Sequence, residues 1–408
     1  MVIVSKKQGR SQAITFTHHS PFLYTVLSTA LSMRDRLLMS DQTLFRDRDV
    51  CELSHIPDVF NYREAQLNEM AFAVGPALHG ARPINLLLKG IPGTGKTSSV
   101  ERIFDEISYT TRRVVPVHVN CQLDHTQFMV FARIFHGVFG HTPPTTGLSI
   151  RRLMNEIGNA LVARQQVLLV CLDDANFIQA EGVLNHVLYT ILRLYEGFPG
   201  VKSGVFLTVS NIDTVLKKVL DPSVMSVLQP TEVYFPPYSG EEIRGILQER
   251  VRRAVYPGVI GSETFDLMVE KTLGCGDLRV GIDLIRRSVL NAEKHARQSV
   301  VPGDVDAAYE ISRYIHLESS VRALSRDEKK LLGQIASYSR DEERMMTSGA
   351  VFNAVREEVP MGYTVFYERL RKFDQMRLIN LYNRRMGGRT REISLRYDAE
   401  KVAEECGG

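Results

Sequence analysis

The feature that most constrains the fold is a glycine-rich octapeptide, GIPGTGKT at Gly90–Thr97, which lies between the apolar run INLLLK (84–89) and a helical stretch at 98–108. It matches G-x-x-x-x-G-K-[ST], in which glycines let backbone N–H groups face phosphate oxygens at a helix N-terminus. Lys96 is expected to reach the β- and γ-phosphates, and the Thr97 hydroxyl to be a ligand of Mg²⁺. The alternative is a glycine-rich turn without a ligand. The predicted contacts with ATP or ADP are Gly90, Ile91, Pro92, Gly93, Thr94, Gly95, Lys96, Thr97 and Ser98.

Short apolar runs alternate with helical periodicities from about residue 57 to 237, and they indicate buried strands of a parallel sheet. The runs span 84–89, 114–120, 167–172, 204–210 and 231–235. Asp173 and Asp174 close the third run, where a carboxylate would lie beside the phosphate loop. We predict that Asp173 binds Mg²⁺ and that Asp174 orients the attacking water. The alternative is an ordinary helix N-cap at Asp173.

The character of the chain changes twice after the sheet. From Ser239 to about residue 319 only helices are expected, beginning at a capping box formed by Ser239 and Glu242. Beyond residue 320, three helices and two short strands around a Gly-Gly tip describe a winged helix-turn-helix. The predicted fold class is therefore α/β: a P-loop core with a parallel sheet, a small helical lid and a C-terminal winged helix. Its predicted parts are an N-terminal extension (1–55), an ATP-binding domain (56–237), a lid (238–319) and a DNA-binding winged helix (320–408).

The charge is uneven along the chain. The formal net charge is only +3 over 408 residues, yet Arg369 to Arg396 hold nine Lys or Arg against Asp374 and Glu392. Such a run is often just a solvated face, but on a helix that enters the major groove and on a wing it favours contact with DNA. The residues predicted to bind DNA here are Thr364, Tyr367, Arg371, Lys372, Arg384, Arg385, Arg389 and Arg391.

Composition excludes several other classes. With 44% hydrophobic and 24% charged residues, the chain is not expected to be disordered. Its five cysteines never form CxxC, so neither a disulfide framework nor a zinc ribbon is predicted. No apolar run is long enough to span a membrane and no signal peptide is evident, so we expect a cytoplasmic, chromosome-associated protein without membrane partners.

Several further segments stand in a specific order around the P-loop and the acidic pair. They include LFRDRDVCELSHIPDVFNYREAQL (44–67), PPTTGLSI (143–150), VSNIDTVLKKVLDPSVMSVLQP (209–230) and GCGDLRVGIDLIRRS (274–288). Over about residues 44–400 the chain resembles the AAA+ replication initiators of archaea, which are related to the eukaryotic origin recognition complex and its helicase-loading partner.

The resemblance implies roles for residues that composition alone does not single out. Asn211 would be a sensor near the γ-phosphate, although a strand-terminal Asn can simply start a turn. Arg279 would reach the γ-phosphate from the lid, the alternative being a solvated helix residue. With Lys96 and Asp174 these two complete the predicted catalytic set. Pro57, Val59, Tyr62 and Arg63 would lie against the adenine. A second DNA contact would lie within 126–148, at Arg133, His136, His141, Thr145, Thr146 and Gly147, unless that stretch is only a packing helix and loop.

Two departures from the family pattern bear on turnover. The acidic motif ends Asp-Asp instead of Asp-Glu, so Asp174 is expected to place the water less well and slow hydrolysis. Ser223 stands where relatives often carry an arginine that acts on a neighbouring subunit, although Lys217 and Lys218 could substitute. An arginine finger supplied in trans accelerates hydrolysis by about 10³- to 10⁵-fold.

The resemblance implies an initiator that binds and deforms double-stranded origin DNA and helps to recruit the replicative MCM helicase, with other initiator paralogues as further possible partners. ATP or ADP with Mg²⁺ would be its cofactors, and slow hydrolysis would act as a switch. Two other classes stay open: an ATP-dependent winged-helix transcriptional regulator, and an AAA+ ATPase that remodels protein.

Overall fold

The computed structural model describes residues 43–57, 60–144, 149–178, 182–210, 220–341, 346–383 and 391–407. The chain divides into two units, 1–44 and 45–408, and the elements below belong to the second.

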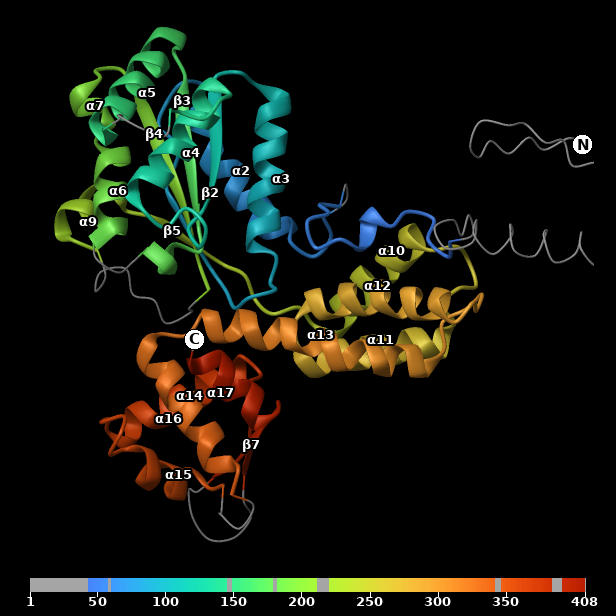
Figure 1. Cartoon of the computed structure of the whole chain (residues 1–408). Helices are drawn as coiled ribbons and strands as arrows, with labels where there is room; N and C mark the ends of the chain where they lie inside the picture. Colours follow the sequence, from blue (N-terminus) through green and yellow to red (C-terminus); the bar gives the residue numbers. More distant parts are fainter. Residues whose placement is uncertain are drawn as a thin grey trace, which may run out of the picture. The chain divides into compact units, whose positions relative to one another are not determined.

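A parallel sheet forms the centre of the N-terminal half, with the strand order β2-β3-β4-β1-β5 (Figure 1). Every neighbouring pair is parallel, as the continuous apolar runs predict. Because β1 lies between β4 and β5, the loop that follows it opens beside the end of β4, and the end of β3 is one strand further along the same edge. The strands are β1 (Leu86–Lys89), β2 (Val114–Asn120), β3 (Val167–Asp173), β4 (Lys202–Val209) and β5 (Thr231–Tyr234).

Helices cover both faces of this sheet, and alternate residues of each strand face opposite layers. Leu168, Val170 and Leu172 of β3 join the apolar cluster formed with α4, α5, α6 and α9, whereas Leu169 and Cys171 join the cluster formed with α2 and α3. The helices are α2 (Glu64–Leu78), α3 (Lys96–Thr110), α4 (Gln127–Phe139), α5 (Ile150–Arg164), α6 (Val183–Leu192), α7 (Leu194–Gly197) and α9 (Pro222–Leu228), with the 3-10 turn η2 (Ala175–Ile178) after β3.

The lid consists of helices, and the predicted capping box is present: the Ser239 hydroxyl accepts from the Glu242 N–H, and the Glu242 carboxylate accepts from the Ser239 N–H. Part of the predicted N-terminal extension packs on this lid, through the 3-10 turn η1 (Asp49–Cys51). Arg250 fastens the contact by donating to the Val50 and His55 carbonyls. The lid helices are α10 (Gly240–Ala254), α11 (Ser262–Cys275), α12 (Leu278–Lys294) and the first part of α13 (Pro302–Arg322).

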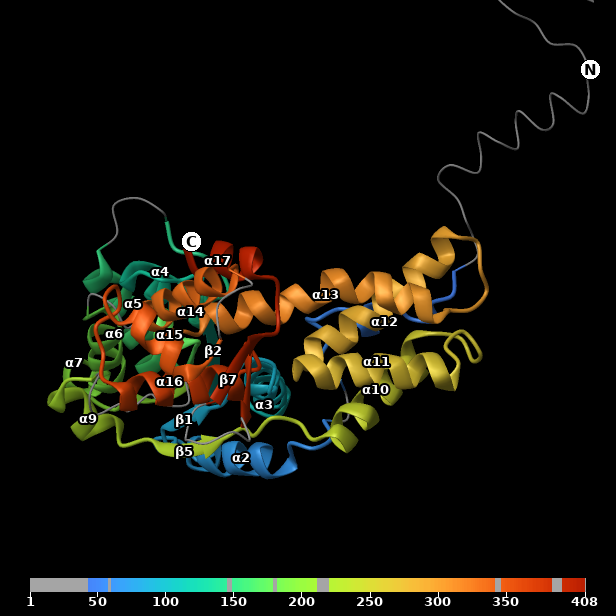
Figure 2. The same cartoon turned by 90° about the horizontal axis from the view of Figure 1, so that it is seen from below.

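Helix α13 continues from the lid into the winged helix, so the predicted boundary at 319/320 falls within one continuous helix (Figures 1 and 2). Strands β6 and β7 pair antiparallel as the predicted hairpin, and the C-terminal helix α17, which was not predicted, packs on α14. The elements are α14 (Arg326–Ser339), α15 (Ser348–Val355), α16 (Tyr363–Gln375), β6 (Ile379–Asn383), β7 (Arg391–Leu395) and α17 (Ala399–Gly407). In the described part of the chain, no helix is both long and apolar enough to cross a membrane.

Candidate nucleotide site and DNA interface

The glycine-rich loop joins β1 to the first turn of α3, as predicted. Gly93 and Gly95 adopt positive φ angles of 78° and 88°, which glycine reaches without strain. Space requires glycine at both positions as well. A Cβ on Gly95 would lie 2.7 Å from the Tyr238 hydroxyl, and a Cβ on Gly93 would collide with the carboxylate of Asp277. The loop is therefore shaped partly by residues far along the chain.

Lys96 lies under this loop and is almost fully buried. Its Nζ donates to the carbonyl oxygens of Gly90 and Ile91, at 2.8 and 3.0 Å. Burial lowers the pKa of Lys96 to about 8, against the opposing effect of Asp174 and Asp173. The ammonium is thus held where β- and γ-phosphates are expected, with little surrounding water to screen it.

Asp173 ends β3 beside the start of α3. Its Oδ2 accepts from the Thr97 hydroxyl at 2.8 Å and lies 3.2 Å from Nε2 of His118, and its Oδ1 accepts from the Thr208 hydroxyl. Burial alone would raise the pKa of Asp173, but hydrogen bonds from His118, Thr208 and Thr97 lower it. An ionised carboxylate next to a hydroxyl is the donor set that Mg²⁺ uses with phosphates, so Thr97 and Asp173 fit this ion.

Asp174 is held in a strained backbone conformation, with φ at 51°. Such a φ is uncommon for residues other than glycine, although Asp tolerates it better than most. The Ser210 hydroxyl and the Gln122 amide donate to the two carboxylate oxygens, at 2.7 and 3.1 Å. The Asp174 N–H donates to Thr208 Oγ1 at 2.7 Å. The carboxylate is therefore fixed toward the cavity, as a group that orients water requires.

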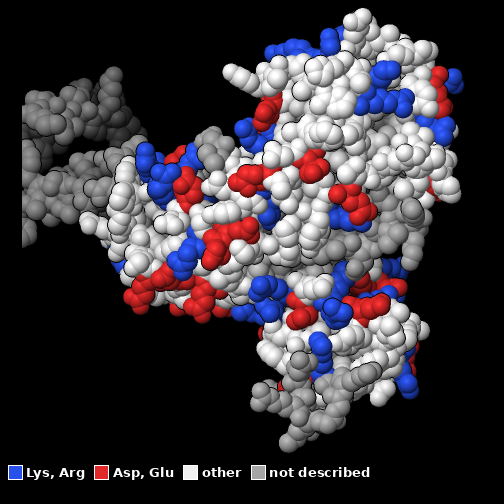
Figure 3. All heavy atoms as spheres, turned by 180° about the vertical axis from the view of Figure 1, so that it is seen from behind, with Lys and Arg blue, Asp and Glu red and all other residues white. Residues whose placement is uncertain are grey.

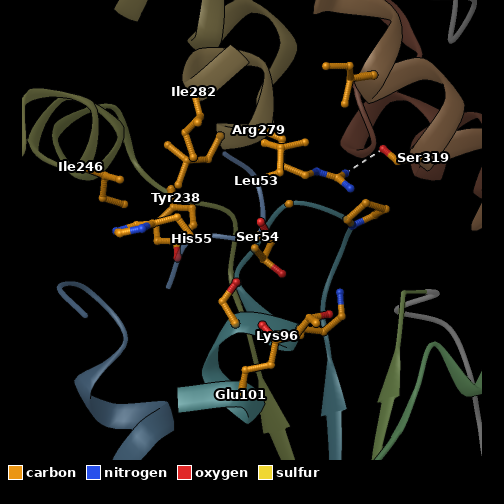
Figure 4. A pocket seen from close by; sticks show the side chains of 18 of the residues that line it. Leu53, Ser54, His55, Lys96, Glu101, Tyr238, Ile246, Arg279, Ile282 and Ser319 are labelled. Carbon is orange, nitrogen blue, oxygen red and sulfur yellow. Dashed lines mark hydrogen bonds between the residues drawn. The ribbon is translucent and has the colours of Figure 1, made fainter. Parts of the chain in front are cut away.

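A cavity of about 500 Å³ opens between the loop and the lid (Figure 4), a size that suits a small-molecule ligand. Among the predicted residues, Pro57, Pro92–Ser98, Asp174 and Arg279 line it. Gly90 and Ile91 do not; their carbonyls hold Lys96, and the Ile91 side chain belongs to the apolar cluster of α13 and the winged helix. The cavity is also lined by Leu53, Ser54, His55, Phe60, Asn61, Tyr238, Ile246 and Ile282.

Two residues predicted to lie against the adenine do not line this cavity. Arg63 is 2% exposed; its guanidinium donates to the Thr94 and Pro236 carbonyls, at 3.0 and 2.7 Å, and stacks 3.7 Å from the Tyr238 ring centroid. The Tyr62 hydroxyl lies against Gly245 of α10. In this structure Arg63 therefore supports the phosphate loop, and Tyr62 contacts the lid. The predicted contact of these two residues with the adenine stays a prediction.

Arg279 lies at the cavity wall on the first turn of α12 (Figure 4). Its Nε donates to Oδ1 of Asp277 at 3.0 Å, and one terminal nitrogen donates to Oδ2 at 2.6 Å. The same nitrogen donates to the Ser319 hydroxyl of α13 at 2.7 Å. The predicted sensor arginine thus faces the cavity while a carboxylate and a hydroxyl hold it.

Several predicted residues lie outside the described part of the chain, so their roles stay predictions. They are Val59, Thr145, Thr146, Gly147, Asn211, Lys217, Lys218, Arg384, Arg385 and Arg389.

Some of the residues predicted to contact DNA lie on the exposed face of α16. Thr364 and Arg371 are exposed, and Tyr367 is half-buried with the Arg391 guanidinium 5.4 Å from its ring centroid. Other residues of the basic run at 369–396 are less available to DNA than the charge of the run implies. Arg377 and Arg396 donate to the Leu273 and Gly274 carbonyls at the end of lid helix α11. On the face shown in Figure 3, basic and acidic side chains are interspersed.

Lys372 does not belong to this exposed face, which corrects the prediction. Its side chain is 9% exposed, and Nζ donates to Oε1 of Glu328 in α14 at 2.8 Å. Its position on α16 turns it toward the first turn of α14 rather than toward solvent. Arg133, predicted as a second DNA contact, is half-exposed and donates to Asp124 at 3.0 Å. Its charge is therefore already paired within the domain.

Four polar residues around the acidic pair were not predicted: His118, Gln122, Thr208 and Ser210. One signal in the sequence could have identified three of them. His118 lies within β2, Thr208 within β4, and Ser210 directly follows β4, so each is near the carboxyl end of a strand beside β3. Parallel strands bring such ends to one edge of the sheet, but only the strand order shows which strands are neighbours.

Comparisons with known proteins agree with this architecture. The family model described as the Cdc6 AAA+ ATPase-type lid domain matches residues 244–310. The ORC1-type DNA replication protein 3 of Haloarcula marismortui is 41% identical, over 91% of this chain and 98% of its own length. These matches confirm the resemblance read from the sequence.

Solved structures show the same fold. That of the Aeropyrum pernix ORC1 protein in complex with DNA has 26% identity and a TM-score of 0.59, covering 89% of this chain and 96% of its own. That of the Aeropyrum pernix ORC2 protein (ADPNP-ADP complexes) has 22% identity and a TM-score of 0.67, covering 89% and 98%. With its P-loop core, lid and winged helix, this chain belongs to the family of ORC1-type DNA replication proteins and has the architecture of an AAA+ ATPase.

Proposed function

We propose that this chain is an ATP-regulated replication initiator that binds and deforms double-stranded origin DNA and helps to recruit the replicative helicase. The observation that supports the proposal is that one chain joins a cavity between the phosphate loop and the lid to a winged helix, which is attached to that lid through α13. Membership of the replication protein family supports the choice of DNA replication over the other classes that use the same fold.

In the nucleotide site, Lys96 and the N–H groups at the start of α3 would bind the β- and γ-phosphates of ATP. Thr97 and Asp173 would hold Mg²⁺, which when bound would neutralise phosphate charge. Asp174 would orient the attacking water and accept its proton, because Ser210 and Gln122 keep its carboxylate in place. Arg279 would report on the γ-phosphate from the lid side.

We propose that hydrolysis is slow and serves as a switch. Asp174 is one methylene shorter than the Glu usual at this position in the family. Ser223, at the start of α9, offers no guanidinium for a neighbouring copy's phosphate. The ATP-bound state would therefore persist long enough to be read by DNA and partner proteins. Asn211 remains the candidate sensor on the core side.

In the DNA site, we propose that α16 enters the major groove through Thr364, Tyr367 and Arg371, while Arg391 and the wing arginines contact phosphates or a narrow minor groove. The MCM helicase and other initiator paralogues are the proposed protein partners. The proposed location is the cytoplasm, in association with the chromosome.

Mapping of the genomic sites bound by the protein in cells tests this function. Enrichment at replication origins, with loss of helicase loading when the protein is removed, is the expected result. Binding confined to promoters would instead make it a transcriptional regulator. ATPase activity and action on protein partners that are indifferent to DNA would instead favour a remodelling ATPase.

A further inference from the structure

Asp277 is a fully buried carboxylate at a junction between the lid and the phosphate loop. It caps α12 by accepting from the Arg279 N–H, and its carboxylate lies directly against Gly93 of the loop. Burial alone would raise the pKa of Asp277, but the charge of Arg279 and hydrogen bonds from His316 and Arg279 lower it far below its usual range. A carboxylate this deeply buried stays ionised only because hydrogen-bond donors and cations compensate its charge.

Two cations or potential cations share this carboxylate. Arg279, facing the cavity, makes a bidentate contact with it. His316, on α13, is the second partner, with Nδ1 3.4 Å from Oδ2, the oxygen that also accepts from Arg279. His316 is itself buried, and its side chain takes no part in the nucleotide chemistry assigned above.

The second nitrogen of His316 contacts the DNA-binding domain. Nε2 lies 2.9 Å from the carbonyl oxygen of Met376, the residue that ends the DNA-reading helix α16. Nδ1 also lies 3.3 Å from the Ser320 hydroxyl. The Asp277 and Met376 oxygens are both acceptors, so the cationic form of His316 is the one that can donate to both at once. Asp277, His316 and Met376 thus form a continuous bridge from the phosphate loop to α16, which we call the His316 bridge.

We propose that His316 is a positioning residue that couples the state of the nucleotide site to the winged helix by bridging the Asp277 carboxylate and the Met376 carbonyl. The inference rests on the proposed function and adds to it the route by which nucleotide affects DNA binding.

The coupling follows from competition for Arg279. A γ-phosphate beside Lys96 offers Arg279 a second anionic partner, and a guanidinium drawn to it leaves Asp277 without its main donor. The carboxylate then relies on His316, which strengthens the bridge and draws α13 and the end of α16 together. ADP lacks the γ-phosphate, so Arg279 stays with Asp277 and Ser319 as in this structure.

The test compares DNA affinity in two nucleotide states, using a duplex recovered from a randomised pool by the full-length wild-type protein. We expect the wild-type dissociation constant to differ between ADP and a non-hydrolysable ATP analogue by about fivefold or more. His316→Gln keeps a donor for the Met376 carbonyl but presents an oxygen to Asp277. The ratio of its two dissociation constants for DNA, with ADP and with the analogue, should therefore fall to about one. Analogue binding, followed by fluorescence titration, should persist in that variant.

Arg396→Ala is the matched control, because it removes a different lid contact, the hydrogen bond to the Gly274 carbonyl at 2.7 Å, and leaves the His316 bridge in place. Its affinity ratio should stay at the wild-type value. An equal loss of the ratio in both variants, or a full ratio in His316→Gln, would overturn the bridge. Wild-type DNA binding without nucleotide dependence would also overturn it and leave the proposed function standing. Failure of the wild type to bind any duplex would contradict the proposed function itself.

Hydrogen exchange on the wild-type protein supplies a readout that needs no variant. The amides of Arg377 and Leu378 close the end of α16 by donating to the Asp374 and Phe373 carbonyls. They should exchange more slowly with the ATP analogue than with ADP. Equal exchange in the two states would refute the coupling even if His316→Gln failed to fold.

Discussion

Replacing Lys372 by Ala tests whether this residue belongs to the fold or to the DNA surface. The pair it forms with Glu328 is buried on both sides, with side chains 9% and 10% exposed. Loss of one partner of a buried ion pair costs about 3–5 kcal/mol. In the Lys372→Ala variant, Oε2 of Glu328 still accepts a hydrogen bond from the Ser325 N–H, at 2.8 Å in this structure. We therefore expect the free energy of unfolding to fall by about 3 kcal/mol, the lower end of that range. Combining Lys372→Met with Glu328→Gln should restore most of the loss, because no charge is then left unpaired.

Differential scanning calorimetry and the salt dependence of DNA binding together distinguish the two roles. Lys372→Ala should lower the unfolding temperature of the winged helix, whereas the exposed Arg371→Ala should leave it nearly unchanged and reduce the salt slope by about one. Burial alone would raise the pKa of Glu328, but Lys372 lowers it below its ordinary 4.5. The pair therefore stabilises the fold above pH 4.5 and loses this contribution as the pH falls through the depressed pKa. A Lys372→Ala protein with wild-type stability and a reduced salt slope would refute this reasoning.

Three further predictions concern the two sites. Lys96→Ala should weaken ATP binding by about 10- to 100-fold, since a charge-assisted contact with phosphate is lost; titration with a fluorescent ATP analogue measures this, and wild-type affinity would contradict the phosphate assignment. Asp174→Ala should retain ATP but slow hydrolysis about 100-fold; unaltered phosphate release in a single-turnover assay would exclude Asp174 as the water-orienting group. Replacing Arg384, Arg385 and Arg389 together by Ala should weaken duplex binding and reduce the salt slope by about three; an unchanged slope would remove the wing from the DNA interface.

Much of the nucleotide site could be predicted because its chemistry is local. Gly93, Gly95 and Lys96 lie within one short loop, and their spacing alone places N–H groups, cation and helix end in reach of phosphate. The end of β3 follows from an uninterrupted apolar run before two carboxylates. The three-part organisation follows from changes in periodicity, which are also local properties of the chain.

The exposure of the basic side chains near the C-terminus could not be predicted from the local pattern of the chain. The sequence shows that Arg377 and Arg396 carry charge, but not that lid carbonyls occupy them. Helical periodicity places Lys372 beside an exposed position, and only the packing of α16 on α14 turns it inward. Charge per segment therefore overstates the surface available to DNA.

The local pattern of the chain predicts a phosphate-binding loop, the residues of that loop and the order of the three parts, because each depends on neighbours along the chain. Which side chains surround those residues depends on tertiary packing, which places Tyr238 against Gly95, Asp277 against Gly93, and His316 between Asp277 and α16. These contacts join residues separated by dozens to well over a hundred positions. Nothing in the local pattern of the chain specifies them, because the partner of a buried polar group is set by which elements pack together.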